Sequence, residues 1–416
     1  MRQDHDHDDD HEHGEHEHER DDRFPLPPRV VRAAHHWGGG YLYRPGQLVV
    51  PTADLGRLRR ELERRGLRQR GDARPISGTS VALVNVAGSQ DPDLIPRLVE
   101  ELRTAEDPHP MMVAPNTVLW GATHARPFTV APPDRAEALR EPGADEPGAG
   151  VTVAVLDGGV DPDHPWFAGR VRPAGPGDVE TPPPPGSTLP VYAGHGTFVA
   201  GLVLLHAPGA TVLARRVFDD FGIVDDVTLA TAIAELPPEV GVCNLSLGGY
   251  AHGDAGTPAI ADALATAWER NPALVVVAAA GNDATTRPAY PAAYKRVIAV
   301  GAIDANGNPA CFTNSGPWVD AVAPGVDAVS TFLTVEAEPA AVPDSCLGVK
   351  HPGTVVFEGF ARWSGTSASA PRVAGAIAAV ISPGVDGPSA VFILVGSATV
   401  KRARGLGAVV DPPAFG

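Results

Sequence analysis

The chain has 416 residues and a formal net charge of −17, from 33 Lys and Arg against 50 Asp and Glu. This length suits roughly two or three domains, and hydrophobic residues, at 43%, are numerous enough for a large core. The acidic balance argues against nucleic acid as a partner, because phosphate binding needs clustered basic side chains. No apolar run approaches the roughly 18 residues that predict a membrane span.

Residues 1–23 form a low-complexity tail rich in His, Asp and Glu. After Met1 this stretch has no large apolar side chain to bury, so we expect it to be disordered. Its histidines allow weak binding of transition metals such as Zn, Cu or Ni. A solvated acidic tail is the favoured interpretation, because closing flexible ligands around a metal loses entropy. A metal store built on this tail is kept as an alternative function.

Residues 24–130 are predicted to form a small α/β module. Leu and Ile recur at spacings of three and four over residues 54–62 and 93–102, which predicts two amphipathic helices, the first with Asp54 as its N-cap. Strands are expected at 48–50, 81–86 and 111–116. The β-α-β-α-β order predicts a two-layer sandwich. A linker rich in Pro, Gly and Ala follows over residues 131–149.

Residues 150–416 show apolar strands separated by helical segments. This pattern predicts an α/β domain with a mostly parallel sheet and helices on both faces. The predicted strands are VTVAVL at 151–156, TVLARRVF at 211–218, VCNLSL at 242–247, LVVVAAA at 274–280 and VIAVGA at 297–302. A further segment, 333–360, is expected to form a hairpin or loop near the site.

Four polar residues stand where an apolar run ends or a helical segment begins: Asp157, His195, Asn282 and Ser367. In an open parallel sheet, ligands bind beyond the carboxyl ends of the strands, so residues from distant segments can converge there. These residues are therefore candidates for one site.

The four residue types together indicate nucleophilic acyl transfer. A serine hydroxyl is a poor nucleophile until a base removes its proton, and histidine is the suitable base near neutral pH. A carboxylate behind the histidine fixes its tautomer and stabilises the imidazolium. An asparagine amide can donate to the oxyanion, and a helix N-terminus beside the serine adds backbone donors.

Five segments in this order resemble the signatures of the subtilisin-like serine protease family, peptidase S8: VAVLDGGVDPDHP, GHGTFVAG, NLSLGG, AAAGN and SGTSASAP. The chain order Asp, His, Ser differs from the chymotrypsin and α/β-hydrolase orders. The resemblance implies a serine endopeptidase that cleaves peptide bonds through an acyl-enzyme on Ser367. It implies that Asp157 orients the base His195 and that Asn282 is the oxyanion donor.

The resemblance also implies a substrate-binding surface for a peptide or protein. Ser246, Leu247 and Gly248 resemble the edge strand that pairs with the substrate backbone. Ala279, Ala280 and Gly281 resemble one wall of the pocket for the residue before the cut, and Ala289 resembles its floor. A small apolar floor suggests an apolar or medium-sized residue at that position.

No cofactor for catalysis is implied by this family. Structural calcium is bound by many of its members, and Asp161 and Asp163 are acidic residues that could serve as ligands. Carboxylates near a turn are common without metal, so calcium is left open.

The N-terminal module resembles the propeptide of the same family. This resemblance implies a ferredoxin-like sandwich that assists folding and blocks the cleft until it is cut, with cleavage expected between Thr129 and Gly150. A physical reason is that large parallel sheets fold slowly. A permanent accessory domain is the rival interpretation.

Three cysteines, an odd and low number, do not predict a disulfide framework. Cys243 is expected to be a buried thiol, and Cys346 is the candidate for a reactive thiol. The acidic N-terminus lacks a secretory signal, which predicts a cytoplasmic protein, with secretion open if the start is misassigned. We expect a monomer. A catalytically silent relative that only binds peptides is the alternative function, and the four intact polar residues argue against it.

Overall fold

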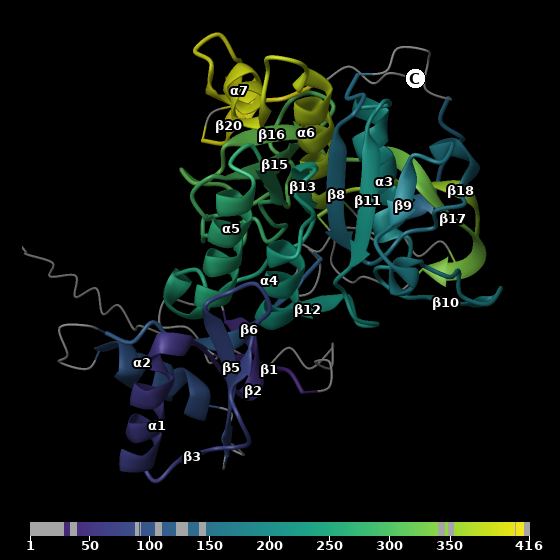
Figure 1. The fold of residues 1–416 in the computed structure, drawn as a ribbon. Helices are drawn as coiled ribbons and strands as arrows, with labels where there is room; N and C mark the ends of the chain where they lie inside the picture. The colour runs from purple at the N-terminus through teal and green to yellow at the C-terminus, as the bar shows by residue number, and fades with distance from the viewer. Residues whose placement is uncertain are drawn as a thin grey trace, which may run out of the picture.

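The computed structural model describes most of the chain in two units (Figure 1). The described residues are 29–33, 40–87, 91, 93–104, 110–121, 132–140, 147–339, 346–347, 353–403 and 405–411. The predicted tail at 1–23 lies outside them. Within the described residues, no helix is long and apolar enough to cross a membrane.

The N-terminal module is an antiparallel sheet with two helices. Strand β2 (Tyr41–Pro51) lies between β5 (Val81–Ala87) and β6 (Ala114–Trp120), and helices α1 (Leu55–Arg64) and α2 (Leu94–Thr104) supply buried leucines. Both predicted helices and the first two predicted strands are confirmed. The third strand, predicted at 111–116, begins later, at Ala114, and continues to Trp120. The short elements are β1 (Val31–Ala33), η1 (Thr52–Asp54), β3 (Arg68–Gln69) and β4 (Arg74–Pro75).

The predicted capping role of Asp54 is wrong. Asp54 ends the 3-10 turn η1 with φ −93° and ψ −3°, and its side chain makes no capping hydrogen bond. A capping side chain usually needs an extended backbone at its own residue. The preceding turn therefore removes the geometry that the sequence pattern suggested.

The larger unit is built on a nine-stranded sheet in the order β19-β20-β16-β15-β14-β13-β8-β11-β9. Neighbouring strands are parallel except for the pair β19 and β20 at one edge. The strands are β8 (Thr152–Asp157), β9 (Val171–Pro173), β11 (Thr211–Arg216), β13 (Val240–Leu245), β14 (Val275–Ala279), β15 (Val297–Ile303), β16 (Ala321–Pro324), β19 (Arg402–Ala403) and β20 (Gly407–Val409).

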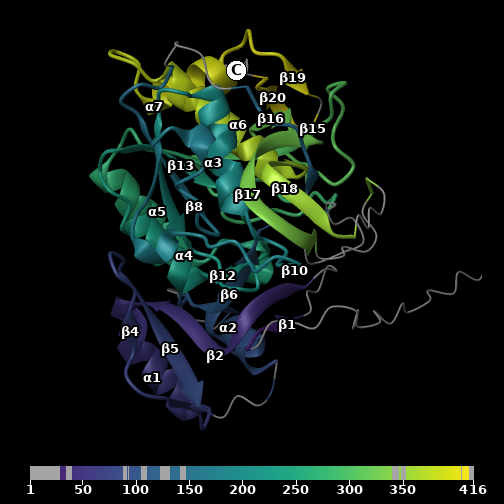
Figure 2. The ribbon, with the colours of Figure 1, turned by 90° about the vertical axis from the view of Figure 1, so that its right-hand side faces the viewer.

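Helices cover both faces of this sheet (Figures 1 and 2). Helices α3 (His195–His206) and α6 (Thr366–Val380) pack with Val153 and Val155 of β8, whereas α4 (Asp226–Ala234) and α5 (Pro258–Arg270) pack with Ala154 and Leu156. The predicted α/β class is confirmed. Other elements are η2 (Pro165–Phe167), η3 (Pro176–Asp178), β12 (Ile223–Asp225), η4 (His252–Asp254), α7 (Gly387–Val391) and η5 (Phe392–Gly396).

The segment before α6 forms a long antiparallel hairpin of β17 (Ala328–Pro339) and β18 (Val355–Trp363), as predicted for this region. Strand β10 (Ser187–Leu189) pairs with β17, and β7 (Asp134–Arg135) pairs with β18. The stretch predicted as a linker thus contributes a short strand to this second sheet.

The predicted reactive thiol at Cys346 is wrong, because Cys346 forms a disulfide with Cys311. The two residues are 35 positions apart in sequence but 6.3 Å apart between Cα atoms, a spacing that only the folded chain creates. Cys243 is buried and free, as predicted, and burial raises the pKa of its thiol to about 12.

Helices α3 and α6 approach each other closely at Gly375. A Cβ atom added there would lie 2.6 Å from the Val203 carbonyl oxygen of α3. Because that neighbour is backbone, it cannot turn away as a flexible side chain would. Glycine at 375 therefore sets the spacing of the two helices.

We expect Gly375→Ala to lower the free energy of unfolding by about 1–3 kcal/mol, because the added methyl group forces the helices apart. Gly56→Ala is the matched control: it lies in α1, where the nearest atom to an added Cβ is the Arg60 Nη1 at 3.9 Å. Gly56→Ala should raise the free energy of unfolding by about 0.5–1 kcal/mol. Urea unfolding measures both, and two shifts of the same sign would contradict the prediction.

Candidate active site

Asp157 and His195 form a buried hydrogen-bonded pair. Asp157 ends β8 and His195 begins α3, with 2.8 Å between Asp157 Oδ1 and His195 Nδ1. The same carboxylate oxygen accepts the Gly158 N–H at 2.7 Å. A carboxylate can only accept, so Nδ1 carries the proton and Nε2 of the neutral ring is left with its lone pair. The pair thus holds the imidazole in the tautomer of a base.

Packing fixes the position of His195. A Cβ on Gly196 would lie 2.0 Å from the Gly159 carbonyl oxygen, so glycine lets the start of α3 touch the turn after β8. The rings of Tyr192 and Trp363 meet the His195 ring nearly at right angles, with centroids 5.8 and 5.2 Å away. The imidazole is therefore confined on several sides.

A buried acid supports the same helix start. Glu180 Oε1 accepts the Gly194 N–H at 2.8 Å, directly before His195. Burial raises the pKa of Glu180 to about 8, although the Gly194 N–H and Arg216 favour the ionised form. No sequence motif marked this residue, because only the folded chain brings it behind the histidine.

Ser367 is the second residue of α6 and is buried. Its Oγ donates to the Ser246 carbonyl oxygen at 3.3 Å, and Ser246 Oγ donates to the Ser367 carbonyl oxygen at 3.1 Å. Ser367 is therefore tied to the segment predicted as the substrate-pairing strand. Its place in the first turn of α6 puts it near the positive end of that helix.

Asn282 is held next to Ser367 through Thr366. Its Oδ1 accepts both the backbone N–H and the hydroxyl of Thr366, each at 2.9 Å, and the Thr366 Oγ1 accepts the Gly281 N–H at 3.1 Å. With the amide oxygen oriented in this way, the Nδ2 donor lies on the opposite side of the side chain. Sequence reasoning missed Thr366, although it stands in the same Gly-Thr-Ser motif as Ser367.

The predicted substrate residues lie around these groups. Leu247 and Gly248 follow Ser246 beyond β13, and Gly248 exchanges two backbone hydrogen bonds with Trp120, at 2.9 and 3.0 Å. Of the remaining predicted residues, Ala279 ends β14, and Ala280, Gly281 and Ala289 follow it.

Gly281 and Ala289 lie close together in the structure. A Cβ on Gly281 would be 3.8 Å from the Ala289 Cβ, and Ala289 is buried. Asn314 fixes this wall, since its Nδ2 donates to the Ala280 carbonyl at 2.9 Å and its backbone N–H donates to the Gly281 carbonyl at 3.0 Å. The pocket roles of these residues stay predictions.

A calcium site does not emerge around Asp161 and Asp163. The Asp161 carboxylate accepts the backbone N–H of Asp163 at 3.1 Å within one turn. Among the residues that the structure describes, no group of three or more His, Cys, Asp or Glu side chains could hold a metal ion. Calcium ligand sets also include backbone carbonyls and waters, so structural calcium stays a prediction.

Residues 148–399 match the subtilase family, Peptidase_S8. The chain belongs to the subtilase family. The predicted membership of the subtilisin-like serine protease family is thereby confirmed.

Two relatives agree with this assignment. The chain is 36% identical over 249 residues to the thermophilic serine proteinase of Bacillus sp. (strain AK1), a match that covers 57% of this chain but only about half, 53%, of the relative. It is 34% identical over 251 residues to thermitase of Thermoactinomyces vulgaris, covering 57% of this chain and 77% of thermitase.

A solved structure shares the fold. Fervidolysin from Fervidobacterium pennivorans, described as a keratinolytic enzyme related to subtilisin, superposes with a TM-score of 0.58 at 20% identity. The match covers 90% of this chain and 61% of fervidolysin. The matched 90% of this chain is more than residues 148–399, so the similarity of fold extends beyond the range of the family match.

Removal of the Thr366 hydroxyl should weaken the site without unfolding it. In Thr366→Val, Asn282 loses one of its two anchors and the Gly281 N–H loses its acceptor, so we expect Ser367 to react about tenfold more slowly with a fluorophosphonate probe. Thr366→Ser keeps the hydroxyl and is the control. Equal labelling rates for both variants and the wild type would contradict this role.

Proposed function

We propose that the chain is a serine endopeptidase whose N-terminal module occupies the substrate channel as an inhibitor. The observation that carries this proposal is strand β6 of the module. At Trp120 this strand pairs antiparallel with both Ile223 of β12 and Gly248, so it lies as an extended peptide between two edges of the catalytic unit. Figure 2 shows β6 beside β12. An extended peptide added to an exposed strand edge is a common mode of substrate recognition.

The register of this strand leads to the proposed nucleophile. Trp120 pairs antiparallel with Gly248, so the module chain runs toward Ser246, which lies two residues before Gly248. The Ser246 carbonyl is the group that accepts the Ser367 hydroxyl. The bond after Ala122 is therefore the one that we propose is cleaved, ahead of the window predicted from sequence. Ala122 itself lies outside the described residues.

The chemistry follows from the four side chains. His195 Nε2 takes the proton of Ser367 Oγ as this oxygen bonds to the carbonyl carbon of the substrate. The Asn282 side-chain amide and the backbone N–H of Ser367, in the first turn of α6, donate to the resulting oxyanion. The C–N bond then breaks, and the imidazolium gives its proton to the leaving amine. Water, activated by the same histidine, releases the acyl group from Ser367, while Asp157 stabilises the imidazolium throughout.

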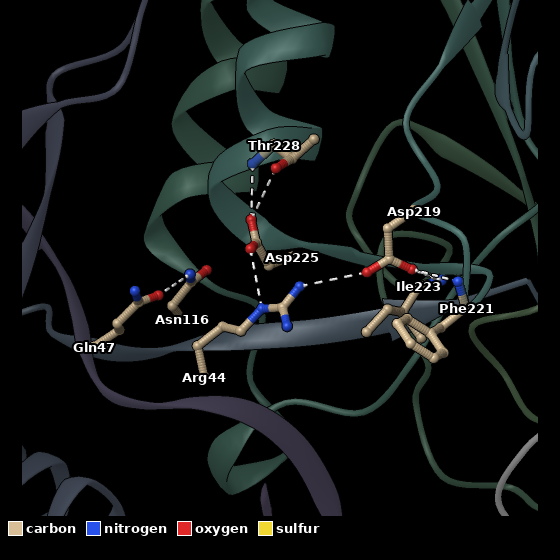
Figure 3. A network of polar contacts seen from close by, with 8 residues as sticks. All are labelled: Arg44, Gln47, Asn116, Asp219, Phe221, Ile223, Asp225 and Thr228. Atoms are coloured by element: carbon tan, nitrogen blue, oxygen red, sulfur yellow. Dashed lines mark hydrogen bonds and ion pairs between the residues drawn. The ribbon is translucent and has the colours of Figure 1, made fainter. Parts of the chain in front are cut away.

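Polar contacts hold the module against the catalytic unit (Figure 3). Arg44 of β2 donates to Asp225 at 3.2 Å and lies 3.8 Å from Asp219. Asp225 is also the N-cap of α4, since its carboxylate accepts the Thr228 N–H at 3.0 Å. One carboxylate thus joins the module to a helix of the catalytic unit, which supports a docked inhibitor.

We further propose that the chain acts as a monomer. The rival functions are a permanent accessory module, a silent peptide-binding relative and a metal store on the N-terminal tail. Each rival predicts a chain that stays whole, so one measurement separates them from the proposed zymogen.

We expect wild-type protein to split over time after Ala122, and Ser367→Ala to stay intact, because only the wild type has the nucleophile. Intact-mass spectrometry on both purified chains, side by side, measures this. A wild-type chain that stays whole while it hydrolyses peptides would contradict the inhibitory role of the module. Failure of Ser367 to react with a fluorophosphonate probe would contradict the proposed peptidase activity.

Asp226 predicts that docking depends on pH. It is fully buried, its carboxylate accepts the Thr117 N–H of β6 at 3.0 Å, and burial raises its pKa to about 8. After separation the carboxyl should return toward an ordinary pKa of about 4. Docking therefore takes up a proton between about pH 4 and 8, and the docked state weakens as pH rises through this window.

Hydrogen exchange of the β6 amides in the intact Ser367→Ala chain tests this dependence. After correction for intrinsic exchange rates, we expect protection to fall between pH 6 and 8. Asp226→Asn cannot titrate and should show a smaller change. If protection of the β6 amides rises toward pH 8 in the Ser367→Ala chain that keeps Asp226, the predicted pH dependence of docking is wrong.

A further inference from the structure

The ring of Tyr192 lies between two glycines, one in the module strand and one in the catalytic unit. A Cβ on Gly121 would be 2.6 Å from Tyr192 Cε1 and 3.0 Å from Phe218 Cζ. A Cβ on Gly222 would be 1.6 Å from Tyr192 Cδ2, on the opposite edge of the ring. The Gly121 N–H faces the Gly222 carbonyl at 3.4 Å. The aromatic ring therefore uses the space that two side chains would need.

The Tyr192 ring has little room to retreat. Phe218 packs against it with centroids 5.5 Å apart, and His195 meets it edge-on at 5.8 Å. The Tyr192 carbonyl accepts the His195 N–H at 3.1 Å, which ties its backbone to the start of α3. The residue is 7% exposed. A substrate side chain at the position of Gly121 would have to displace a packed aromatic cluster.

Backbone conformation does not explain the glycine at 121. Gly121 is absent from the described glycines with positive φ, whereas Gly222 has φ 70°. A residue with a side chain could adopt the Gly121 backbone, so the restriction comes from the space beside it. The side chains that limit this space belong to the catalytic unit, so they restrict any peptide that binds in the same register.

We propose that Tyr192 and Phe218 make this enzyme select glycine at the residue immediately before the one whose carbonyl is attacked. The inference rests on the proposed function and defines a substrate class: extended peptides with glycine at that position and a small residue after it. In the chain's own sequence these residues are Gly121 and Ala122. The two aromatic residues determine specificity and take no part in proton transfer.

Peptides of the form Leu-Trp-Xaa-Ala-Thr, blocked at both ends, test the selection. The enzyme is the wild-type protein, expressed as the full chain and allowed to process itself. We expect kcat/KM to be roughly ten- to hundredfold higher for Gly than for Ala at Xaa, and lower still for Val. Tyr192→Ala should bring the Gly-to-Ala ratio toward one. Because the ratio compares two substrates on one enzyme, a general loss of activity does not change it.

Phe221→Ala is the matched control. Phe221 lies in the same turn as Gly222, but its side chain is 52% exposed, so this variant should keep the wild-type ratio. Phe218→Ala enlarges the same space from the other ring and gives a second measurement if Tyr192→Ala fails to fold. Each enlarging variant should lower the Gly-to-Ala ratio.

The outcomes separate this inference from the proposed function. Equal hydrolysis of the Gly, Ala and Val peptides overturns the selection while leaving the peptidase intact. A wild-type ratio that persists in both Tyr192→Ala and Phe218→Ala overturns the assignment to these rings. Loss of all peptide cleavage, together with no fluorophosphonate labelling of Ser367 in the wild type, overturns the proposed function instead.

Discussion

The contact between helices α3 and α6 fixes the relation of His195 to Ser367, because each residue lies in the first turn of its helix. The two helices approach closely at Gly375. Both begin beyond the carboxyl ends of strands, since His195 contacts Asp157 at the end of β8 and Ser367 contacts Ser246 just after β13. Two positive helix ends at one place favour a developing oxyanion and disfavour an imidazolium. The buried carboxylate of Asp157 offsets the second effect, so the pair with His195 is an electrostatic requirement of this arrangement as well as a geometric one.

Strand β6 pairs with two backbone segments of the catalytic unit. Strand β12 and the segment at Gly248 both pair with Trp120, and either would otherwise expose backbone donors and acceptors. Unpaired edges attract other extended chains. A channel between two such edges therefore suits an extended substrate. Strand β6 of the module pairs with both edges and so covers their backbone groups.

Local patterns in the sequence predicted the strands, the helices and the four polar residues, because apolar periodicity and short motifs depend on neighbours along the chain. Features that depend on tertiary contact were not predictable in this way. The disulfide of Cys346 needs the loop to fold back on Cys311. Asp54 lost its capping role to a turn just before the helix. The contact of the Tyr192 ring with Gly121 joins residues 71 positions apart in the sequence, so no local pattern predicts it.

The docked contacts have a consequence for release of the module. The bonds from Arg44 to Asp225, from Thr117 to Asp226 and from Trp120 to Gly248 all involve module residues that precede Ala122. Cleavage after Ala122 would leave every one of these contacts in place. Trp120 also shares a buried apolar cluster with Ile223 and Tyr250 of the catalytic unit. Under the proposed function, cutting and release would therefore be separate events, and release would require these polar and apolar contacts to break.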